Sequence, residues 1–254
     1  MSDDRGSGPV DDLPGRMSAA NDLIDDEPCA PGGASGTVGR LERLCSALSR
    51  SLPAMGVGVS LLAADSYGGG TVAASGVESR KIEELQFSLG EGPCIDAYAL
   101  RSPVLEPDLA GRGTGRWPGY GLAALDQGVQ AVFAFPLQVG AARAGSLDVY
   151  RNAPGALTPA ELAQAFTFAE VAMGLLVDGQ HGLATTRSRA DLDDVMAYRL
   201  EVYQAQGMVM VDLGVSIDTA MARLRAYAYA EGRGLSDVAK DIVSGTLTLE
   251  RDMP

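Results

Sequence analysis

Apolar residues recur at spacings of three and four in the first regularly patterned stretch of the chain, residues 37–52. This period is typical of an amphipathic helix, and Pro53 ends it. The period then changes to two at residues 57–61, before a glycine triplet and a second extended run at 71–74. The alternation predicts two strands of a hairpin joined by a flexible loop.

The middle of the chain combines short helices with a second pair of strands. Thr158 and Pro159 stand where a helix cap and a first helical turn belong, so a longer helix is expected from there to about Asp178. Strands that come in pairs at both ends of a segment, with helices between them, predict an α+β fold with an antiparallel sheet and flanking helices. The shorter elements are expected as helices at 77–87, 94–100 and 120–126, an extended piece at 103–106, and strands at 130–139 and 145–150.

The last part of the chain is predicted to be entirely helical. A long helix carries the three–four spacing from 192 to 213, and its second half, 202–213, is apolar nearly all round. This indicates burial on several sides, and we interpret the first half of the helix as a coiled-coil seam against another chain. Gly214 ends this helix, Ser216 caps the second, and a third begins near Ser236. Three helices in so short a stretch of chain make a small core that gains stability from pairing, so a homodimer is expected.

Composition limits the classes of protein that the chain can represent. Its 254 residues, 46% of them hydrophobic, suffice for two ordinary globular domains. The sequence has neither an uninterrupted apolar run of membrane-spanning length nor a secretory leader pattern, so a cytoplasmic protein with no membrane partner is expected. Residues 1–36 are acidic, rich in small and turn-forming residues and poor in apolar ones, and are expected to form a disordered arm.

Candidate chemistry is sparse. The net charge of −13 argues against nonspecific binding of a polyanion. Three cysteines without C-x-x-C spacing and a single histidine disfavour a disulfide framework, a zinc site and a Cys–His nucleophile, so no catalytic residue, metal or cofactor is identified. Cys94, at a Gly-Pro turn that opens a helix, has two interpretations: a redox-sensing thiol or a small core residue. A reductase that uses a cysteine pair is disfavoured because Cys45 and Cys94 fall on different elements.

Several motifs in the first part of the chain occur together in one known domain. The segment GEGPCIDA at 90–97, the triplet RWP at 116–118 and the helix start LTPAEL at 157–162 resemble the GAF domain found ahead of RNA-binding modules in bacterial regulators. The resemblance implies a GAF sensory domain over 37–180 with a pocket for an unknown small-molecule ligand. The sequence supplies no chromophore-binding Cys-His pair and does not identify the ligand.

Residues 181–254 resemble a linker helix followed by an ANTAR domain. The three ANTAR helices carry an Ala-x-Gly, an Ala-x-x-x-Leu-Arg-x-x-Ala and a Val-Ala pattern, which stand here at 205–207, 220–228 and 238–239. The family commonly has a lysine where this chain has Gln206. The resemblance implies a dimer that binds two adjacent hairpins with similar hexanucleotide loops in nascent RNA, and so stabilises an antiterminator that excludes the terminator hairpin.

The residues expected to face the RNA loops are Gln206, Gly207, Arg225 and Arg233. Unpaired loop bases expose edges that helical RNA hides, so selective binding needs less positive charge than tracking phosphates does. Each residue also has a plainer interpretation, as a solvated surface side chain or, for Gly207, as a position of close helix packing. The alternative function is a protein-interaction signalling scaffold without direct RNA binding. The neutral charge balance of 199–240 and the glutamine at 206 favour this alternative.

Overall fold

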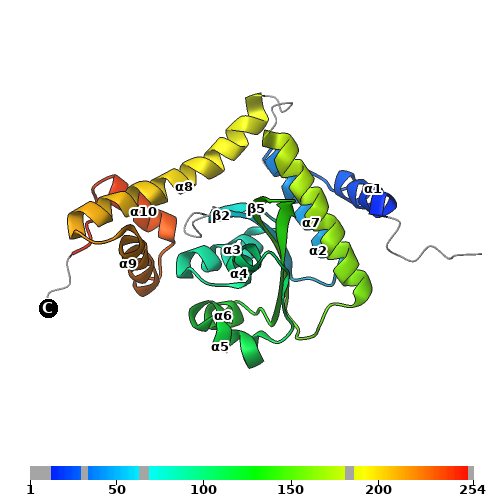
Figure 1. The fold of residues 1–254 in the computed structure, drawn as a ribbon, viewed down its shortest axis with the longest axis horizontal. Helices are drawn as coiled ribbons and strands as arrows, with labels where there is room; N and C mark the ends of the chain where they lie inside the picture. The colour runs from blue at the N-terminus through cyan, green and yellow to red at the C-terminus, as the bar shows by residue number, and fades with distance from the viewer. Residues whose placement is uncertain (1–12, 30–33, 63–68, 181–185, 251–254) are drawn as a thin grey trace, which may run out of the picture.

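The computed structural model describes residues 13–29, 34–62, 69–180 and 186–250, which form a sheet-containing part followed by a helical part (Figure 1). The chain order is α1 (Leu13–Asp25), α2 (Gly36–Ser51), β1 (Gly56–Leu62), β2 (Gly69–Ala74), α3 (Val77–Leu89), α4 (Pro93–Leu100), β3 (Val104–Glu106), a π-helical turn (Leu109–Gly113), α5 (Thr114–Arg116), α6 (Pro118–Asp126), β4 (Ala131–Val139), β5 (Ala142–Arg151), α7 (Pro159–Gln180), α8 (Thr186–Leu213), α9 (Ile217–Ala230) and α10 (Leu235–Val243).

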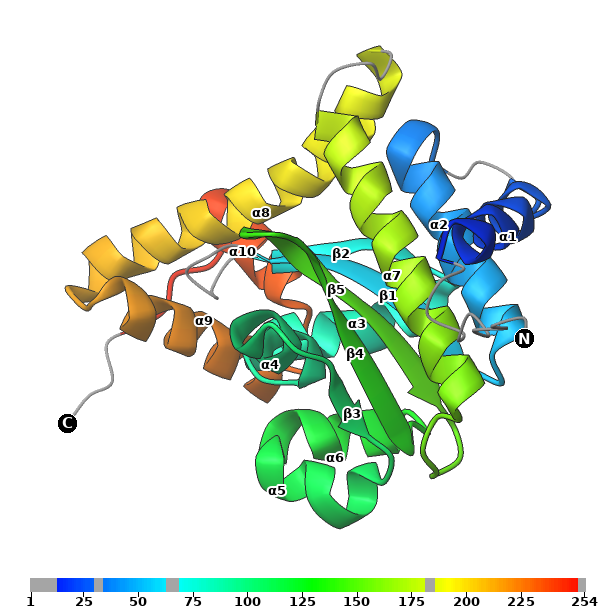
Figure 2. The same cartoon turned by 45° about the vertical axis from the view of Figure 1, so that its right-hand side comes forward.

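One five-stranded sheet forms the centre of the first part, with strand order β2-β1-β5-β4-β3. All neighbouring strands are antiparallel. Helices α2 and α7 cover one face, and α3 and α4 cover the other (Figure 2). The predicted α+β architecture with an antiparallel sheet and flanking helices is therefore confirmed.

Apolar and polar residues alternate along β1 and β5, so one face of the sheet is apolar and the other carries polar side chains. Val57 and Val59 of β1 pair with Val149 and Leu147 of β5, and all four belong to the apolar core under α2 and α7. Since successive strand residues point to opposite faces, the residues between them point toward α3 and α4. Several of those residues are polar, and they include Asp148.

Helix α7 begins with the cap that the sequence predicts. The backbone N–H of Thr158 donates to Glu161 Oε2 at 2.6 Å, and the N–H of Glu161 donates to Thr158 Oγ1 at 3.3 Å. This reciprocal pair is a capping box. By length and composition alone, 159–178 is apolar enough to cross a membrane. Here the helix packs against α1, α2 and the sheet, which accounts for its apolar face.

Part of the expected disordered arm is instead a helix. Leu13–Asp25 forms α1, which contacts α2 and α7 and buries Ala20 and Ile24. Arg40 of α2 pairs with Asp25 at 3.2 Å. The few apolar residues of α1 are sufficient because α2 and α7 supply the rest of the core that they join. Residues 1–12 and 30–33 lie outside the described part of the chain.

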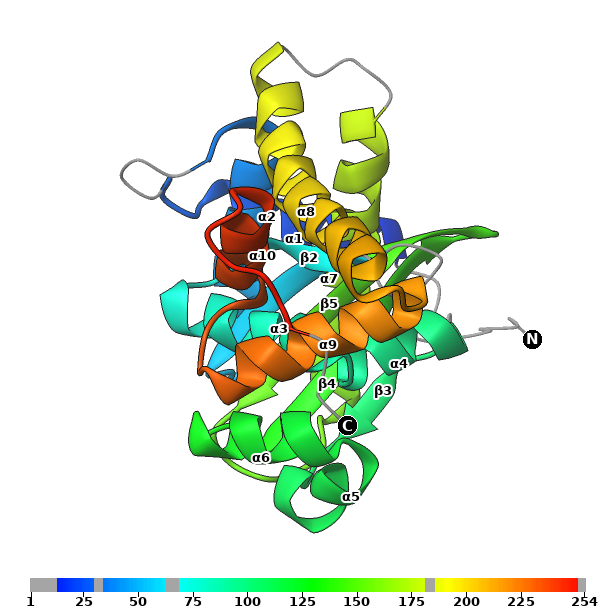
Figure 3. The ribbon, with the colours of Figure 1, turned by 90° about the vertical axis from the view of Figure 1, so that its left-hand side faces the viewer.

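Helices α8, α9 and α10 enclose a separate small core, to which α8 contributes Ala205, Val209 and Leu213. The Ser216 side chain accepts the N–H of Thr219, which confirms the predicted cap of α9. This helical unit does not stand apart from the sheet domain. Figures 1 and 3 show α9 beside α3, and α8 also contacts α2 and β2.

The packing of α1 can be tested with two neighbouring residues. Ile24→Ala should lower the free energy of unfolding by about 2 kcal/mol, because Ile24 is fully buried between helices. Leu23→Ala is the matched control and should change it by less than about 0.5 kcal/mol, since Leu23 is 43% exposed. Urea denaturation of the full chain measures both. Equal effects of the two changes would show that α1 does not pack in solution.

Candidate functional site

Six polar side chains lie between the sheet and α3 with no exposed surface. We call this set the polar layer; it consists of Ser60 from β1, Glu83 and Gln86 from α3, and Ser146, Asp148 and Tyr150 from β5. The strand members share one face because of the two-residue period described above. Burial of polar groups is costly unless they are hydrogen-bonded, so the layer needs internal partners.

Every carboxylate oxygen of the polar layer accepts a hydrogen bond. Glu83 accepts from the hydroxyls of Ser60 and Tyr150, both at 2.5 Å. Asp148 accepts from the Ser146 hydroxyl at 2.5 Å and from Gln86 Nε2 at 2.7 Å. The layer therefore connects α3 to the adjacent strands β1 and β5 of the sheet.

Both buried carboxyls bind a proton more tightly than exposed ones do. Burial raises the pKa of Glu83 well above its usual value, and the neighbouring charge of Asp148 adds to the effect. Burial also raises the pKa of Asp148 to about 6, although hydrogen bonds from Ser146 and Gln86 act in the opposite direction. The protonation state of the polar layer therefore changes close to physiological pH.

Tyr120 and Cys94 lie next to the polar layer. Both are buried, and the hydroxyl of Tyr120 has no hydrogen-bond partner among the described residues. Burial raises the pKa of the Cys94 thiol well above its usual value, and the charges of Asp148 and Glu83 raise it further. A reactive cysteine needs access and a lowered pKa, so the structure favours the core interpretation of Cys94.

The GEGPC segment holds three helices together over the polar layer. Gly90 has φ +73°, the left-handed conformation that ends α3. Glu91 accepts the N–H groups of Gly119 and Tyr120, at 2.6 and 2.9 Å, and so fixes the start of α6. The backbone N–H of Cys94 donates to Gln86 Oε1 at 2.8 Å and thereby ties α4 to the layer.

The RWP triplet makes a similar connection. Asp96 of α4 accepts from Arg116 Nε at 2.9 Å and from Trp117 Nε1 at 3.1 Å. The motifs that carried the resemblance therefore position helices, while the polar layer itself was missed by sequence reasoning. Its one local signal is the alternation of Ser146, Asp148 and Tyr150 along β5, a pattern that ordinarily indicates a strand face toward water.

Two of the residues expected to face RNA lie on α8. Gln206 is 2% exposed, and its Nε2 donates to the backbone carbonyl of Ile217 at 2.9 Å. The expectation that Gln206 lies on a surface is therefore wrong for this conformation, because its amide connects α8 to the start of α9. A Cβ on Gly207 would meet no atom within 4 Å, so Gly207 is not required for packing within the described part of the chain.

The two expected arginines have protein partners. Arg225 of α9 is half-buried, and its Nε donates to the backbone carbonyl of Phe87 in α3 at 3.1 Å. Arg233 follows α9 and forms an ion pair with Asp241 of α10 at 2.6 Å. The structure therefore does not bring the four residues together on one exposed surface, and it directs Arg225 toward the sheet domain.

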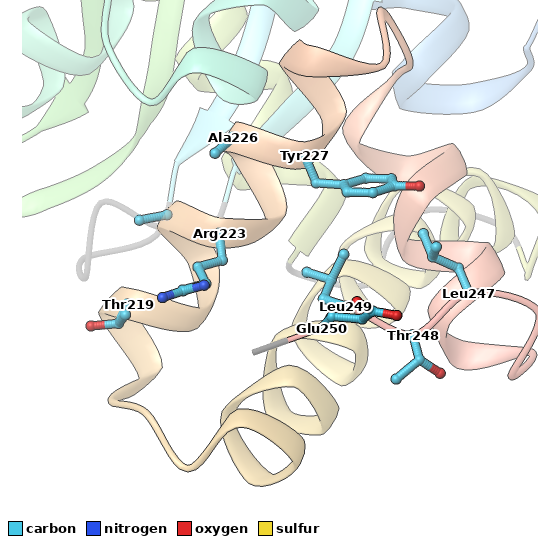
Figure 4. Close-up of a pocket in the computed structure, with 9 residues that line it drawn as sticks. Thr219, Arg223, Ala226, Tyr227, Leu247, Thr248, Leu249 and Glu250 are labelled. Carbon is cyan, nitrogen blue, oxygen red and sulfur yellow. The ribbon is translucent and has the colours of Figure 1, made fainter. Parts of the chain in front are cut away.

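A groove that the sequence did not indicate lies on another side of α9. It has a volume of about 820 Å³, and its walls are α9 and residues 247–250 (Figure 4). Arg223 and Tyr227 are its charged and aromatic members on α9. Leu247 and Leu249 stand on the opposite wall. The groove exists because the chain folds back over α9 after α10, which is a tertiary contact.

Comparison with known proteins agrees with this geometry. A family model described as GAF domain matches residues 40–176, and one described as ANTAR domain matches residues 190–243. No curated protein matches the chain.

Two solved structures resemble the first part of this chain in fold, and at 12% identity the likeness extends to the fold only. One is the GAF domain from Acinetobacter phosphoenolpyruvate-protein phosphotransferase, with 12% identity and a TM-score of 0.50, covering 66% of this chain and 95% of that one. The other is its Coxiella burnetii counterpart, with 12% identity and a TM-score of 0.50, covering 68% and 98%.

The architecture is an antiparallel sheet with helices on both faces, followed by a helical unit. Because the GAF match spans more than half of the sequence, the chain belongs to the GAF domain family, and it carries an ANTAR domain after the GAF domain. GAF is a ligand-sensing domain and ANTAR is an RNA-binding antitermination domain. Both are regulatory rather than catalytic domains.

The protonation of the polar layer predicts a pH dependence of stability. Asp148 has a usual carboxyl pKa in the unfolded chain and a raised one in the folded chain, so the folded state gains protons as pH falls through about 6. The free energy of unfolding should therefore be higher at pH 5 than at pH 7.5, with Asp148 contributing on the order of 1 kcal/mol. Asp148→Asn should remove that contribution, and Asp126→Asn, at an exposed position, should retain it. Urea denaturation at pH 5 and pH 7.5 measures the free energy of unfolding of each protein. If the difference between the two pH values were the same in Asp148→Asn as in the unmodified chain, the raised pKa of Asp148 would be contradicted.

Proposed function

We propose that this protein is a signal-responsive regulator of transcription antitermination. In this proposal, the ANTAR domains of a dimer bind paired hairpin loops in nascent RNA and prevent the terminator hairpin from forming, under the control of a small molecule sensed by the GAF domain. The observation that carries the proposal is the ANTAR match over 190–243, on three helices with their own closed core. We further propose that the protein is not an enzyme and acts in the cytoplasm without a membrane partner.

The proposed RNA contacts combine charge with stacking surfaces. Arg225 and Arg233 are proposed to contact the loops, whereas Gly207 is proposed to lie in the dimer seam described below. Arg223 and Tyr227 in the groove on α9 offer a guanidinium and an aromatic ring, which are the groups that bind unpaired bases in RNA-binding proteins. Gln206 is proposed to act indirectly, since its hydrogen bond to Ile217 fixes the turn that orients α9.

An exposed stripe along α8 supports the proposed homodimer. Leu200 is 65% exposed and Val211 is 71% exposed, although both are aliphatic. With Gln204 and Gly207 they follow spacings of four, three and four, which is the seam pattern of a coiled coil. Gly207 would allow a second helix to approach closely at the middle of this stripe. We propose that α8 of one chain pairs with α8 of its partner along these residues. The sequence analysis expects the seam on the first half of the helix, whose side chains up to position 199 lie outside the described part of the chain.

The RNA proposal can be tested with the full chain and two synthetic RNAs. An RNA with two hexanucleotide-loop hairpins should bind more tightly than a version with scrambled loops. Arg233→Ala, which leaves the contact of Arg225 with α3 in place, should weaken binding to the first RNA by about 5- to 100-fold, which corresponds to 1–3 kcal/mol for a specific arginine contact. Arg112→Ala removes an arginine with a 74% exposed side chain from the GAF domain and serves as the control. Filter binding measures each affinity. Equal affinity for both RNAs would reject the proposal, and absence of RNA retention would favour a protein-interaction scaffold.

The dimer can be tested separately. Val211→Asp should weaken self-association by about two orders of magnitude, because an unpaired carboxylate in the seam costs several kcal/mol. Leu122→Asp makes the same kind of change at a 60% exposed residue of α6 and should leave the dimer intact. Light scattering coupled to size-exclusion chromatography reports the molecular mass. A Val211→Asp protein that stays dimeric at the same concentrations would refute the α8 seam.

A further inference from the structure

The GAF domain covers one side of the ANTAR domain. Helix α9 contacts α3, and α8 contacts β2 and α2, so the two domains share an interface within one chain (Figure 3). Arg225 is part of that interface, whereas Arg223, two positions earlier on α9, lines the groove described above. A residue two positions away lies on a different side of a helix. The GAF domain therefore covers one side of α9 but not the side that lines the groove.

The partner of Arg225 is the carboxyl-terminal end of α3. Phe87, whose carbonyl accepts the hydrogen bond from Arg225 Nε at 3.1 Å, lies in the last turn of that helix. The last four carbonyls of a helix have no partner within the helix and carry partial negative charge, which favours a cation there. Arg225 therefore supplies from the ANTAR domain the charge that the end of α3 lacks.

Gly90 makes room for the arginine. A Cβ at this position would overlap Nη1 of Arg225 and stand 2.8 Å from its Cζ. Gly90 also has the left-handed φ of +73° that ends α3. The first glycine of the GEGPC segment thus allows both the turn and the close approach of the guanidinium.

The same turn of α3 is attached to the polar layer. Gln86 precedes Phe87, and its side chain donates to Asp148 and accepts the N–H of Cys94. A change in the hydrogen bonds of the polar layer therefore acts on the turn whose carbonyl binds Arg225. This path consists of direct contacts only, from Asp148 through Gln86 and the adjacent peptide to Arg225.

Glu84 of α3 and Asp237 of α10 are like charges on the two domains, and like charges oppose docking. Burial raises the pKa of Glu84 on α3, and the nearby charge of Asp237 on α10 raises it further. Arg80 acts in the opposite direction.

We propose that the structure shows an autoinhibited state, in which the end of α3 holds Arg225 away from RNA and a signal in the GAF domain releases it. This inference rests on the proposed function, because it takes Arg225 as an RNA contact. In the docked state the binding-competent fraction is small, and the apparent affinity for RNA is lowered by that fraction.

Gly90→Ala in the full chain tests the docked state. The added methyl group displaces the guanidinium of Arg225 from the end of α3, so binding of the two-hairpin RNA should tighten about tenfold if docked chains outnumber released ones by roughly ten to one. Gly128→Ala is the matched control: Gly128 has a similar φ of +84°, and a Cβ there would meet no atom within 4 Å. Its RNA affinity should equal that of the unmodified chain.

A second pair of variants keeps the test decisive if Gly90→Ala fails to fold. Glu84→Lys replaces the repulsion with an attraction to Asp237, so it should favour docking and weaken RNA binding by about tenfold relative to Glu78→Lys. Glu78→Lys makes the same charge change at an exposed position near the start of α3. Filter binding to the two-hairpin RNA measures all four proteins. Equal affinities within both pairs would overturn autoinhibition alone, and failure of every protein to bind RNA would overturn the proposed function and autoinhibition together.

Discussion

Two carboxyl groups without exposed surface, those of Glu83 and Asp148, lie between α3 and the sheet, and the geometry of the sensor domain depends on how they are accommodated. Burial of an ionised carboxylate costs several kcal/mol unless hydrogen bonds or a proton compensate for it. Here hydroxyls and an amide from α3, β1 and β5 supply the hydrogen bonds, and the raised pKa values favour retention of protons. These requirements fix the distance and register of α3 on the sheet.

The position of α3 then determines the relation between the two domains. Its last turn carries Gln86, which belongs to the polar layer, and Phe87, whose carbonyl binds Arg225 of the ANTAR domain. The glycine after this turn leaves space for the arginine. Gln86, which binds the polar layer of the GAF domain, and Phe87, which binds the ANTAR domain, are therefore adjacent in sequence. The end of a single helix contacts both.

The charge of the protein is consistent with selective rather than general contact with nucleic acid. A chain with a net charge of −13 gains little from tracking phosphates, so binding has to come from a few directed groups. Arg225 is one such group, and in this structure it is occupied within the chain. Arg223 and Tyr227 line a groove on another side of α9, and the exposed stripe on α8 lies on a helix whose opposite side is buried.

The sequence alone determined the order and type of nearly all elements, because periodicity, capping and turn residues act within a few positions. The capping box at Thr158 and the paired strands are examples. Tertiary structure decided the features that depend on residues far apart in sequence. These are the packing of α1 on α7, the burial of Gln206 against Ile217, the polar layer and the hydrogen bond from Arg225 to α3. A polar residue in a strand or an arginine on a helix has the same local pattern whether it faces water or another domain, so only the packed chain distinguishes the two.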